Sequence, residues 1–320
     1  MIRDITEKVL NGDSISREDA MVIASVSHNE IFALFYAANR IRTQFRGDNA
    51  DLCAIINAKS GACPEDCSYC AQSRGNPAGI ETFSLVEKKT VLDRAKEAKS
   101  GGAKRFCVVT SGKKASGKEL EEIAVMIAGV RALGLLPCAT LGLLAREELE
   151  ELKKAGLERY HHNLETSERF FPEICSTHTY RDKIETIKSV KSTGLSLCSG
   201  GIFGLGEQWK DRIDMAFTLR EIGPDSVPVN FLIPVKGTGL GGRRYLEPFE
   251  ALKIISLYRF ILPDKEIRIC GGRMHTLGEF NSFVFFAGAD GLLVGNYLTT
   301  HGRKFEDDLE IIREYGLNFS

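Results

Sequence analysis

A repeated pattern is the feature of this sequence that most constrains its fold. A short apolar run is followed by a loop, then by an amphipathic stretch, and often by a glycine just before the next run. Eight such runs occur, at residues 52–58, 105–110, 135–141, 157–163, 195–199, 226–232, 266–270 and 291–295. Short apolar strands that alternate with helices are typical of parallel βαβ units.

Helical patterns lie between the apolar runs, and glycines indicate where these helices end. They include residues 120–133, 146–155, 181–192 and 247–260, and Gly134, Gly156, Gly194 and Gly223 stand where glycine ends helices. Eight units in roughly 250 residues is the size of a (β/α)8 barrel. A doubly wound open sheet is the alternative, but polar residues near the ends of so many strands favour the barrel.

The sequence therefore predicts an α/β fold with two parts. We expect a (β/α)8 TIM-type barrel over residues 51–320 and an N-terminal helical extension over residues 1–50. Within that extension, Ser16 followed by Asp19 indicates the start of a helix.

Composition and charge exclude several classes of protein. The formal net charge of −1 gives no strong field that would attract nucleic acid or an anionic membrane. The N-terminal residues lack the apolar segment of a signal peptide, and no run approaches the length of a membrane span. We therefore expect a cytoplasmic protein with no nucleic-acid or membrane partner. Its nine cysteines then indicate metal, redox or catalytic use rather than a disulfide framework.

Three cysteines form the strongest local motif. Cys63, Cys67 and Cys70 have the spacing C-x3-C-x2-C and lie in the loop after the first predicted strand. Three thiolates can bind three irons of a four-iron cluster and leave the fourth iron open to a ligand. A zinc site is the alternative, but zinc usually takes four ligands in two pairs, and no near partner of this triplet is present.

Three more cysteines occupy matching places on different predicted strands. Cys107, Cys138 and Cys198 each lie inside an apolar run, and alternate residues of barrel strands point into the lumen. A single free cysteine is usually a small buried apolar residue. Three at matching positions beside the triplet instead indicate a second cluster. An arginine facing a barrel core needs an anionic partner, and Arg105 and Cys107 share one strand face.

The motifs resemble a known family. The triplet, with Tyr69 before its last cysteine, is similar to the signature of the radical S-adenosylmethionine superfamily. Within it, the chain resembles the biotin synthase family over about residues 51–300, through segments 61–70, 160–167, 198–202, 226–230, 268–273 and 298–300. That resemblance implies a [4Fe–4S] cluster that cleaves S-adenosylmethionine to a 5′-deoxyadenosyl radical. It also implies radical insertion of sulfur into dethiobiotin, with an auxiliary [2Fe–2S] cluster as the sulfur donor.

The resemblance also implies a set of site residues. Cys107, Cys138, Cys198 and Arg268 match the auxiliary ligands, and no catalytic residue is implied beyond the cluster ligands. The expected contacts with S-adenosylmethionine are Tyr69, Asn163, Glu165, Ser199, Gly200 and Gly201. The expected contacts with the substrate are Asn163, Asn230, Thr299, Thr300 and His161. A homodimer and a reduced flavodoxin or ferredoxin as electron donor are implied as partners.

Several positions depart from the family pattern. Cys53 and Cys270 stand where many members have serine, and a fourth thiolate would suit a four-iron auxiliary cluster with Arg268 as its neighbour. Of the two, Cys53 is the preferred extra ligand. His161 replaces an asparagine, Glu165 an aspartate and Ala71 a proline.

Two other readings of the motifs stay open at this point. Another radical enzyme of the same barrel type, such as a hydrogenase-maturation or methylornithine-synthase enzyme, shares the triplet but lacks the strand cysteines with the arginine. A non-catalytic iron–sulfur or zinc protein gives no purpose to the set of Asn163, Asn230, Thr299 and Thr300. No family position matches Cys175, which we expect to be structural or incidental.

Overall fold

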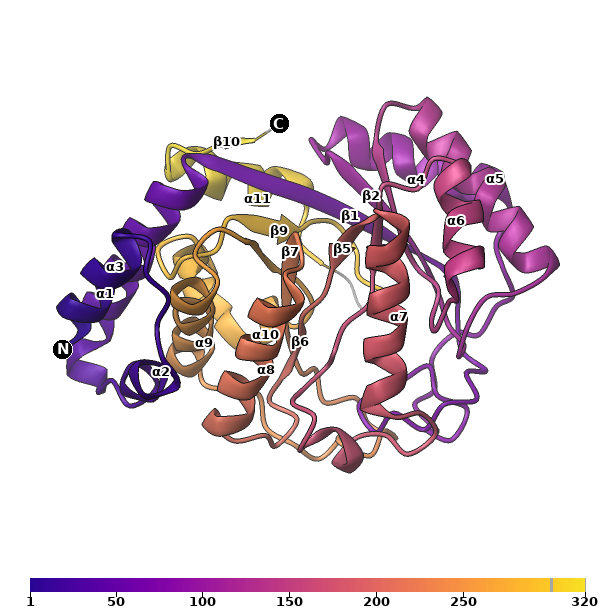
Figure 1. Ribbon diagram of the computed structural model, residues 1–320. Coiled ribbons are helices and arrows are strands. Elements are labelled where there is room, and N and C mark those ends of the chain that lie inside the picture. The colour runs from indigo at the N-terminus through magenta and orange to yellow at the C-terminus, as the bar shows by residue number, and fades with distance from the viewer. Residues whose placement is uncertain (300–301, 320) are drawn as a thin grey trace.

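The computed structural model describes residues 1–299 and 302–319 (Figure 1). Its helices are α1 Ile2–Leu10, α2 Arg17–Ala24, α3 Ile31–Arg46, α4 Lys88–Ser100, α5 Lys118–Ala132, α6 Arg146–Lys154, α7 Tyr180–Thr193, α8 Trp209–Ile222, α9 Pro248–Ile261, α10 Arg273–Leu277 and α11 Phe305–Glu314, with 3-10 turns η1 His28–Glu30, η2 Phe171–Glu173 and η3 Gly278–Val284. Its strands are β1 Asn49–Lys59, β2 Arg105–Thr110, β3 Leu136–Thr140, β4 Arg159–His161, β5 Ser196–Cys198, β6 Gly201–Phe203, β7 Ser226–Phe231, β8 Glu266–Ile269, β9 Gly291–Leu293 and β10 Asn318–Phe319.

The strands form a closed parallel barrel. Its order is β1-β2-β3-β4-β5-β7-β8-β9, and β9 pairs again with β1 to complete the ring. Each of the eight predicted runs overlaps one strand of this ring, and only β1 extends beyond its run. The barrel prediction is therefore confirmed, and the open-sheet alternative is wrong. The sequence did not indicate β6, a short continuation after β5 that pairs with β7, or β10, which pairs with the start of β1.

The predicted helix ends are confirmed by the backbone. Gly194 follows α7 with a φ of 69° and Gly223 follows α8 with a φ of 64°, both left-handed. A residue with a Cβ is strained in this conformation, which is why glycine ends these helices. The helices cover the outside of the barrel (Figure 1), and their apolar faces share one core with the outward side chains of the strands.

Strand β1 illustrates how the two faces of each strand are divided. Leu52, Ala54 and Ile56 pack outward against the helices in the main core. Cys53 and Ile55 alternate with them and belong to a separate cluster inside the barrel. Since all strands are parallel, every loop that follows a strand lies at the same end of the barrel. The three-cysteine loop after β1 is therefore at this end, which we call the mouth.

The first residues form helices that pack beside the barrel. At the start of α2, the backbone N–H of Asp19 donates to Ser16 Oγ over 3.1 Å, and that of Ser16 donates to Asp19 Oδ2 over 3.0 Å. This capping box is the predicted helix start. Helix α3 lies along α9, and α2 contacts both α8 and α9 (Figure 1).

In the part of the chain that the structure describes, no single helix has the length and apolar character to cross a membrane. The segments Arg17–Ala24 and His28–Arg46 have that length and apolar character only when they are counted together, and a bend of 100° separates them.

A buried arginine on α9 bonds to the residues that precede β8 and β9, at the end of the barrel opposite the mouth. Arg259 Nε donates to the carbonyl oxygen of Gly288 over 2.7 Å, and Nη1 donates to that of Lys265 over 2.8 Å. Its Nη2 pairs with Asp290 Oδ1 over 2.5 Å, and Asp290 also accepts from Arg46. Both Arg259 and Asp290 are almost completely buried.

We expect Arg259→Met to destabilise the protein by about 3–5 kcal/mol, because Asp290 and several carbonyl groups would lose their buried partner. The matched control is Arg146→Met, which removes an exposed pair with Glu150 on α6 and should change stability by about 0.5 kcal/mol or less. Urea unfolding of matched preparations measures both. Equal midpoints for the two variants would contradict the assigned role of Arg259.

Candidate active site in the barrel lumen

A cavity of about 370 Å³ extends from the mouth into the barrel. At its inner end it is lined by the thiols of Cys53, Cys107, Cys138, Cys198 and Cys270, with Arg159 and Arg268. At the mouth it is lined by Tyr69, Cys70, Ala71 and Gln72 from the three-cysteine loop. Between these ends lie His161, Asn163, Glu165, Asn230 and Thr299. Most residues singled out from the sequence therefore meet at one cavity.

Some predicted site residues do not line this cavity. Cys63 and Cys67 belong to the mouth loop, and Ser199, Gly200 and Gly201 to the segment after β5, but none of them is among the residues that line the cavity. A Cβ on Gly200 would lie 2.0 Å from the carbonyl oxygen of Pro228, so close strand packing by itself requires this glycine. Thr300 lies outside the described residues.

Below the thiols, five charged side chains form a layer that we call the floor: Asp51, Arg105, Arg159, Glu266 and Arg268. Arg159 Nη1 pairs with Glu266 Oε2 over 3.2 Å, while Arg268 Nη2 pairs with both Asp51 and Glu266. Burial opposes the ionisation of Glu266, but Arg268 and Arg159 outweigh that effect and lower its pKa to about 2. Both carboxylates therefore face cations.

The floor carries more positive than negative groups. Three guanidinium groups face two carboxylates, and three buried N–H positions, Arg105 Nε, Arg105 Nη1 and Arg268 Nε, have no hydrogen-bond partner among the described residues. A buried donor without a partner costs about 1–3 kcal/mol. An anionic sulfide cluster on the thiols directly above would accept from such groups and balance the charge. The donor set therefore fits an iron–sulfur cluster.

Strand register explains why the thiols converge. Cys107 on β2 is the partner of Cys138 on β3, and Cys138 is the partner of Arg159 on β4. Partnered residues of parallel strands point to the same face, so these side chains share the lumen. The neighbouring Cys53 thiol lowers the pKa of Cys138 against the opposing effect of burial, and Arg159 contributes in the same direction. Among these thiols, ionisation is therefore favoured at Cys138.

The two extra cysteines lie on different sides of this thiol layer. Cys53 Sγ donates to the carbonyl oxygen of Ala54 over 3.6 Å, and the neighbouring thiols of Cys138 and Cys107 both help to raise its pKa. Cys270 follows β8 and interacts electrostatically with Arg268 and Cys198, and burial raises its pKa to about 12. Cys53 is therefore next to two of the family-matched cysteines, whereas Cys270 is on the Cys198 side.

The three-cysteine loop has a tightly bonded backbone. The N–H of Arg74 donates to the carbonyl oxygen of Cys63 over 2.8 Å, and Asn76 Nδ2 donates to those of Cys67 and Cys70 over 3.1 and 2.8 Å. These bonds leave the three thiols partly exposed, unlike the fully buried thiols of the lumen. Ala62 just before the motif has a φ of 52°, a strained value for a residue with a Cβ.

The spacing of these sulfurs is informative about the metal. Single zinc sites place all ligand atoms about 2.0–2.3 Å from the ion, so the ligands crowd together. Among the described residues, Cys63, Cys67 and Cys70 do not gather within 4.8 Å of one another, whereas Cys67, Cys175 and His178 do. The wider arrangement of the triplet suits a multi-iron cluster.

A hydrogen-bonded chain runs along the cavity wall from the thiols toward the mouth. Asn163 Oδ1 accepts from the Gly200 N–H over 3.0 Å and from His161 Nε2 over 2.9 Å. The other ring nitrogen, Nδ1, then accepts from Thr140 Oγ1 over 2.8 Å, and Thr140 is 3.6 Å from Cys107 Sγ. Burial lowers the pKa of His161 to about 4, so its ring stays neutral.

Two further polar groups are oriented toward the cavity. Asn163 Nδ2 donates to Glu165 Oε2 over 3.3 Å, and Glu165 has a φ of 72°, which is rare for a side-chain-bearing residue and typical of functional sites. The Asn230 amide donates to the carbonyl oxygen of Gly201 and accepts from the Gly271 N–H. Its orientation is thereby determined, while a further N–H and a lone pair remain for a ligand.

Sequence reasoning missed several residues of the site. Arg159 and Glu266 of the floor stand two residues before His161 and Arg268, and the same two-residue alternation that indicated Arg105 could have identified them. Cys175 was expected to be structural, yet its sulfur lies 3.8 Å from that of Cys67. No local pattern could have indicated this contact, because 108 residues separate the two cysteines.

Comparisons with solved structures confirm the fold. The chain superposes on methylornithine synthase with a TM-score of 0.86, at 20% identity and over 99% of this chain and 97% of that one. It superposes on an FeFe-hydrogenase maturase from Carboxydothermus hydrogenoformans with a TM-score of 0.82, at 18% identity and over 99% and 78% of the two chains. At these identities the likeness concerns the fold alone.

Comparisons of sequence are more specific. Residues 58–219 match the Radical SAM superfamily, and residues 228–318 match the Biotin and Thiamin Synthesis associated domain. Biotin synthase of Thermodesulfovibrio yellowstonii is 51% identical over 92% of this chain and 93% of its own length. Biotin synthase of Trichlorobacter lovleyi is 48% identical over 99% and 96%. The chain therefore belongs to the biotin synthase family of radical S-adenosylmethionine enzymes.

Proposed function

We propose that this barrel converts dethiobiotin to biotin by radical insertion of sulfur, with the two ends of one cavity as its working parts. The observation that carries the proposal is that cavity. It joins a three-cysteine loop at the mouth to five buried thiols above an arginine-rich floor. The relatives that share nearly the whole chain are biotin synthases. The methylornithine-synthase and hydrogenase-maturation alternatives are supported only by a shared fold.

We assign the cluster ligands by position in the barrel. Cys63, Cys67 and Cys70 would bind the [4Fe–4S] cluster at the mouth. Cys107, Cys138 and Cys198 would bind the auxiliary cluster in the lumen. When bound, these groups supply the electron that cleaves S-adenosylmethionine and the sulfur that is inserted.

We propose Cys53 as a fourth thiolate of the auxiliary cluster, which would make a four-iron form possible. Cys53 and Cys270 share one side-chain cluster with Cys107 and Cys138. The choice of Cys53 is supported by its electrostatic interaction with both Cys138 and Cys107, whereas Cys270 interacts with Cys198. Arg268 would be a neighbour rather than a ligand, because its Nη2 is already paired with Asp51 and Glu266. Its remaining N–H at Nε would then donate to the cluster.

The residues between the clusters would bind and orient the two small molecules. Glu165 is placed to accept hydrogen bonds from a ribose diol, and Tyr69, Ser199, Gly200 and Gly201 are proposed as the other contacts with S-adenosylmethionine. Asn230 offers a donor and an acceptor to the ureido group of dethiobiotin, while Asn163 would contact both molecules. Thr299 lines the cavity and Thr300 follows it, as proposed contacts for the carboxylate tail. The apolar part of the wall, including Val109, Ile202 and Leu293, would exclude water from a reactive carbon centre.

Three wider features belong to the same proposal. An electron donor of the flavodoxin or ferredoxin type would approach the partly exposed mouth loop. A cytoplasmic homodimer is proposed from the family resemblance. Residues 1–50 would form a helical extension of the barrel at 51–320, consistent with the packing of α3 along α9.

The function is tested by anaerobic assay of the reconstituted and reduced protein. With S-adenosylmethionine and dethiobiotin we expect both biotin and 5′-deoxyadenosine by mass spectrometry. Cys67→Ala should abolish both products, because a mouth ligand is lost, while Cys270→Ser should retain deoxyadenosine. Deoxyadenosine without biotin would point to a different substrate, and neither product from iron-loaded protein would contradict the assignment.

The composition of the auxiliary cluster is tested by iron counting and Mössbauer spectroscopy. A four-iron auxiliary cluster predicts about eight iron atoms per chain, whereas a two-iron cluster predicts about six. Cys53→Ser should lower the count and change the auxiliary spectrum, because the proposed fourth thiolate is lost. Cys270→Ser is the matched control and should leave both unchanged. If Cys53→Ser behaves like the parent, Cys53 is not a ligand.

The hydrogen-bonded chain at His161 gives a third test. His161→Ala removes the link between Thr140 and Asn163, so we expect kcat/KM for dethiobiotin to fall about 10- to 100-fold through misplacement of the amide. Because the ring is neutral, parent and variant should show parallel pH profiles from about pH 6 to 8. His275→Ala, whose ring stacks on Tyr245, should keep parental kinetics. A parental kcat/KM in His161→Ala would show that the chain does not orient Asn163.

A further inference from the structure

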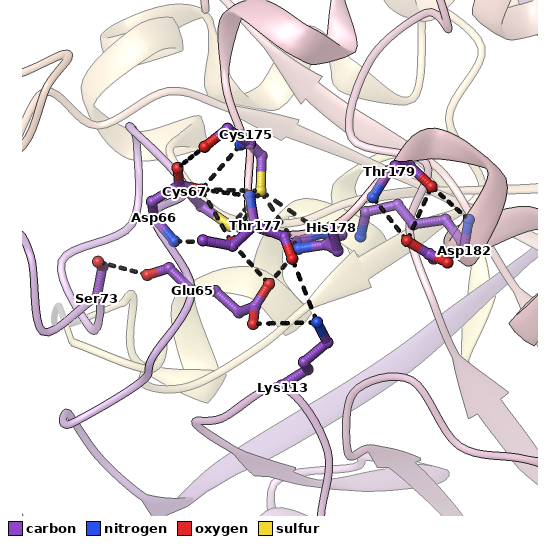
Figure 2. A network of polar contacts seen from close by, with 12 residues as sticks. Glu65, Asp66, Cys67, Ser73, Lys113, Cys175, Thr177, His178, Thr179 and Asp182 are labelled. Carbon is purple, nitrogen blue, oxygen red and sulfur yellow. Dashed lines mark hydrogen bonds and ion pairs between the residues drawn. The ribbon is translucent and has the colours of Figure 1, made fainter.

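One cysteine lies outside both groups of proposed cluster ligands. Cys175 follows η2 on a segment that packs against the three-cysteine loop (Figure 2). The N–H of Ser68 donates to the carbonyl oxygen of Ile174 over 2.8 Å, and the Asp66 carboxylate accepts from the N–H groups of Ser176 and Thr177 over 2.9 and 3.2 Å. Backbone bonds from both sides therefore determine the 3.8 Å separation between Cys175 Sγ and Cys67 Sγ.

The neighbours of Cys175 limit where its thiol proton can point. Asp66 Oδ1 is 3.2 Å from Cys175 Sγ, but its two lone pairs already accept from the N–H groups of Ser176 and Thr177. His178 Nδ1 lies 3.3 Å away, but it is 2.5 Å from Glu65 Oε2, so its proton is directed to that carboxylate. Cys67 Sγ has no other hydrogen bond among the described residues, and with its own proton it donates to Cys175 Sγ. As an iron-bound thiolate, Cys67 would instead be an acceptor, with Cys175 as its hydrogen-bonding neighbour.

Groups behind Cys175 make this orientation rigid. Glu65 accepts from His178 and from Thr177 Oγ1 over 2.8 Å, and Lys113 Nζ lies 3.8 Å from its second oxygen (Figure 2). The His178 ring also packs edge-on against Phe171 at 5.6 Å. Both Glu65 and His178 are buried. A buried and fully bonded support of this kind is what orients a second layer of groups around a metal ligand.

We propose that Cys175 is a positioning residue that donates an S–H···S hydrogen bond to Cys67 and makes the mouth cluster easier to reduce. The proposal rests on the assignment of Cys67 as a cluster ligand. Iron binds cysteine as thiolate, so the proton shared by the two sulfurs must then be carried by Cys175. A hydrogen bond to a ligand sulfur disperses its negative charge, and such bonds help to set the potential of iron–sulfur clusters.

The test is a redox titration of the protein with both clusters, followed by electron paramagnetic resonance. The signal that changes on addition of S-adenosylmethionine identifies the mouth cluster. Cys175→Ala should lower its midpoint potential, with the equilibrium constant for reduction falling up to about tenfold, which is about 59 mV for one electron. Cys175→Ser keeps an O–H donor and should stay at or above the parental potential.

A matched control separates the sulfur contact from general disturbance of the segment. Ser176→Ala removes a hydrogen bond to Asp66 one residue away but leaves the two sulfurs in place, so its potential should equal that of the parent. Equal potentials in Cys175→Ala and the parent would overturn the proposal, as would a Cys175→Ser potential below the parental value. If Cys175→Ala does not assemble its cluster, the midpoint potential of Cys175→Ser relative to the parent still tests the proposal.

Two other outcomes would overturn the proposal at a different step. Parent protein with no signal sensitive to S-adenosylmethionine would contradict the assignment of Cys67 itself. Stoichiometric zinc that is lost in both Cys175→Ala and His178→Ala would show that Cys67, Cys175 and His178, whose ligand atoms lie within 4.8 Å, form a single-ion site. Equal potentials with an intact signal contradict only the role of Cys175.

Discussion

The imbalance of charge on the barrel floor is the interaction on which the rest of the site depends. Burying ionised groups inside a barrel is costly unless each finds a partner. Here Glu266 and Asp51 pair with part of three guanidinium groups, and three buried N–H positions of Arg105 and Arg268 have no hydrogen-bond partner among the described residues. The floor therefore both closes the lower barrel and creates an anion site at the level of the cysteines. A purely apolar floor would close the barrel equally well but would disfavour an anionic cluster above it.

Much of this arrangement follows from periodicity, which is why the sequence predicts it. Strand alternation places Cys107 with Arg105 in the lumen, and parallel closure brings Cys138 beside them. The same alternation applies to Arg159 and Glu266, which stand two residues before His161 and Arg268 on their strands. The helix ends at Gly194 and Gly223 were also predictable, because they rest on local backbone preference.

Other features depend on contacts that no local pattern carries. Periodicity places Cys53 and Cys270 inside the barrel alike, but only the tertiary structure puts Cys53 against Cys138. The pairing of Cys175 with Cys67 depends on how residues 172–178 pack on the mouth loop. Likewise, the glycine at position 200 seemed suited to a close ligand, whereas the carbonyl oxygen of Pro228 already occupies the space of its side chain.

The buried floor has a consequence for the lifetime of the site. Because Arg159, Glu266 and Arg268 lie beneath the thiols, iron and sulfide would have to reach those thiols through the cavity that we propose for dethiobiotin. Under that assignment, repair of a consumed auxiliary cluster and occupation by substrate or product would exclude each other in space. A bound product would then delay regeneration by remaining in place, and the rate of product departure would set the earliest moment at which the cluster can be rebuilt.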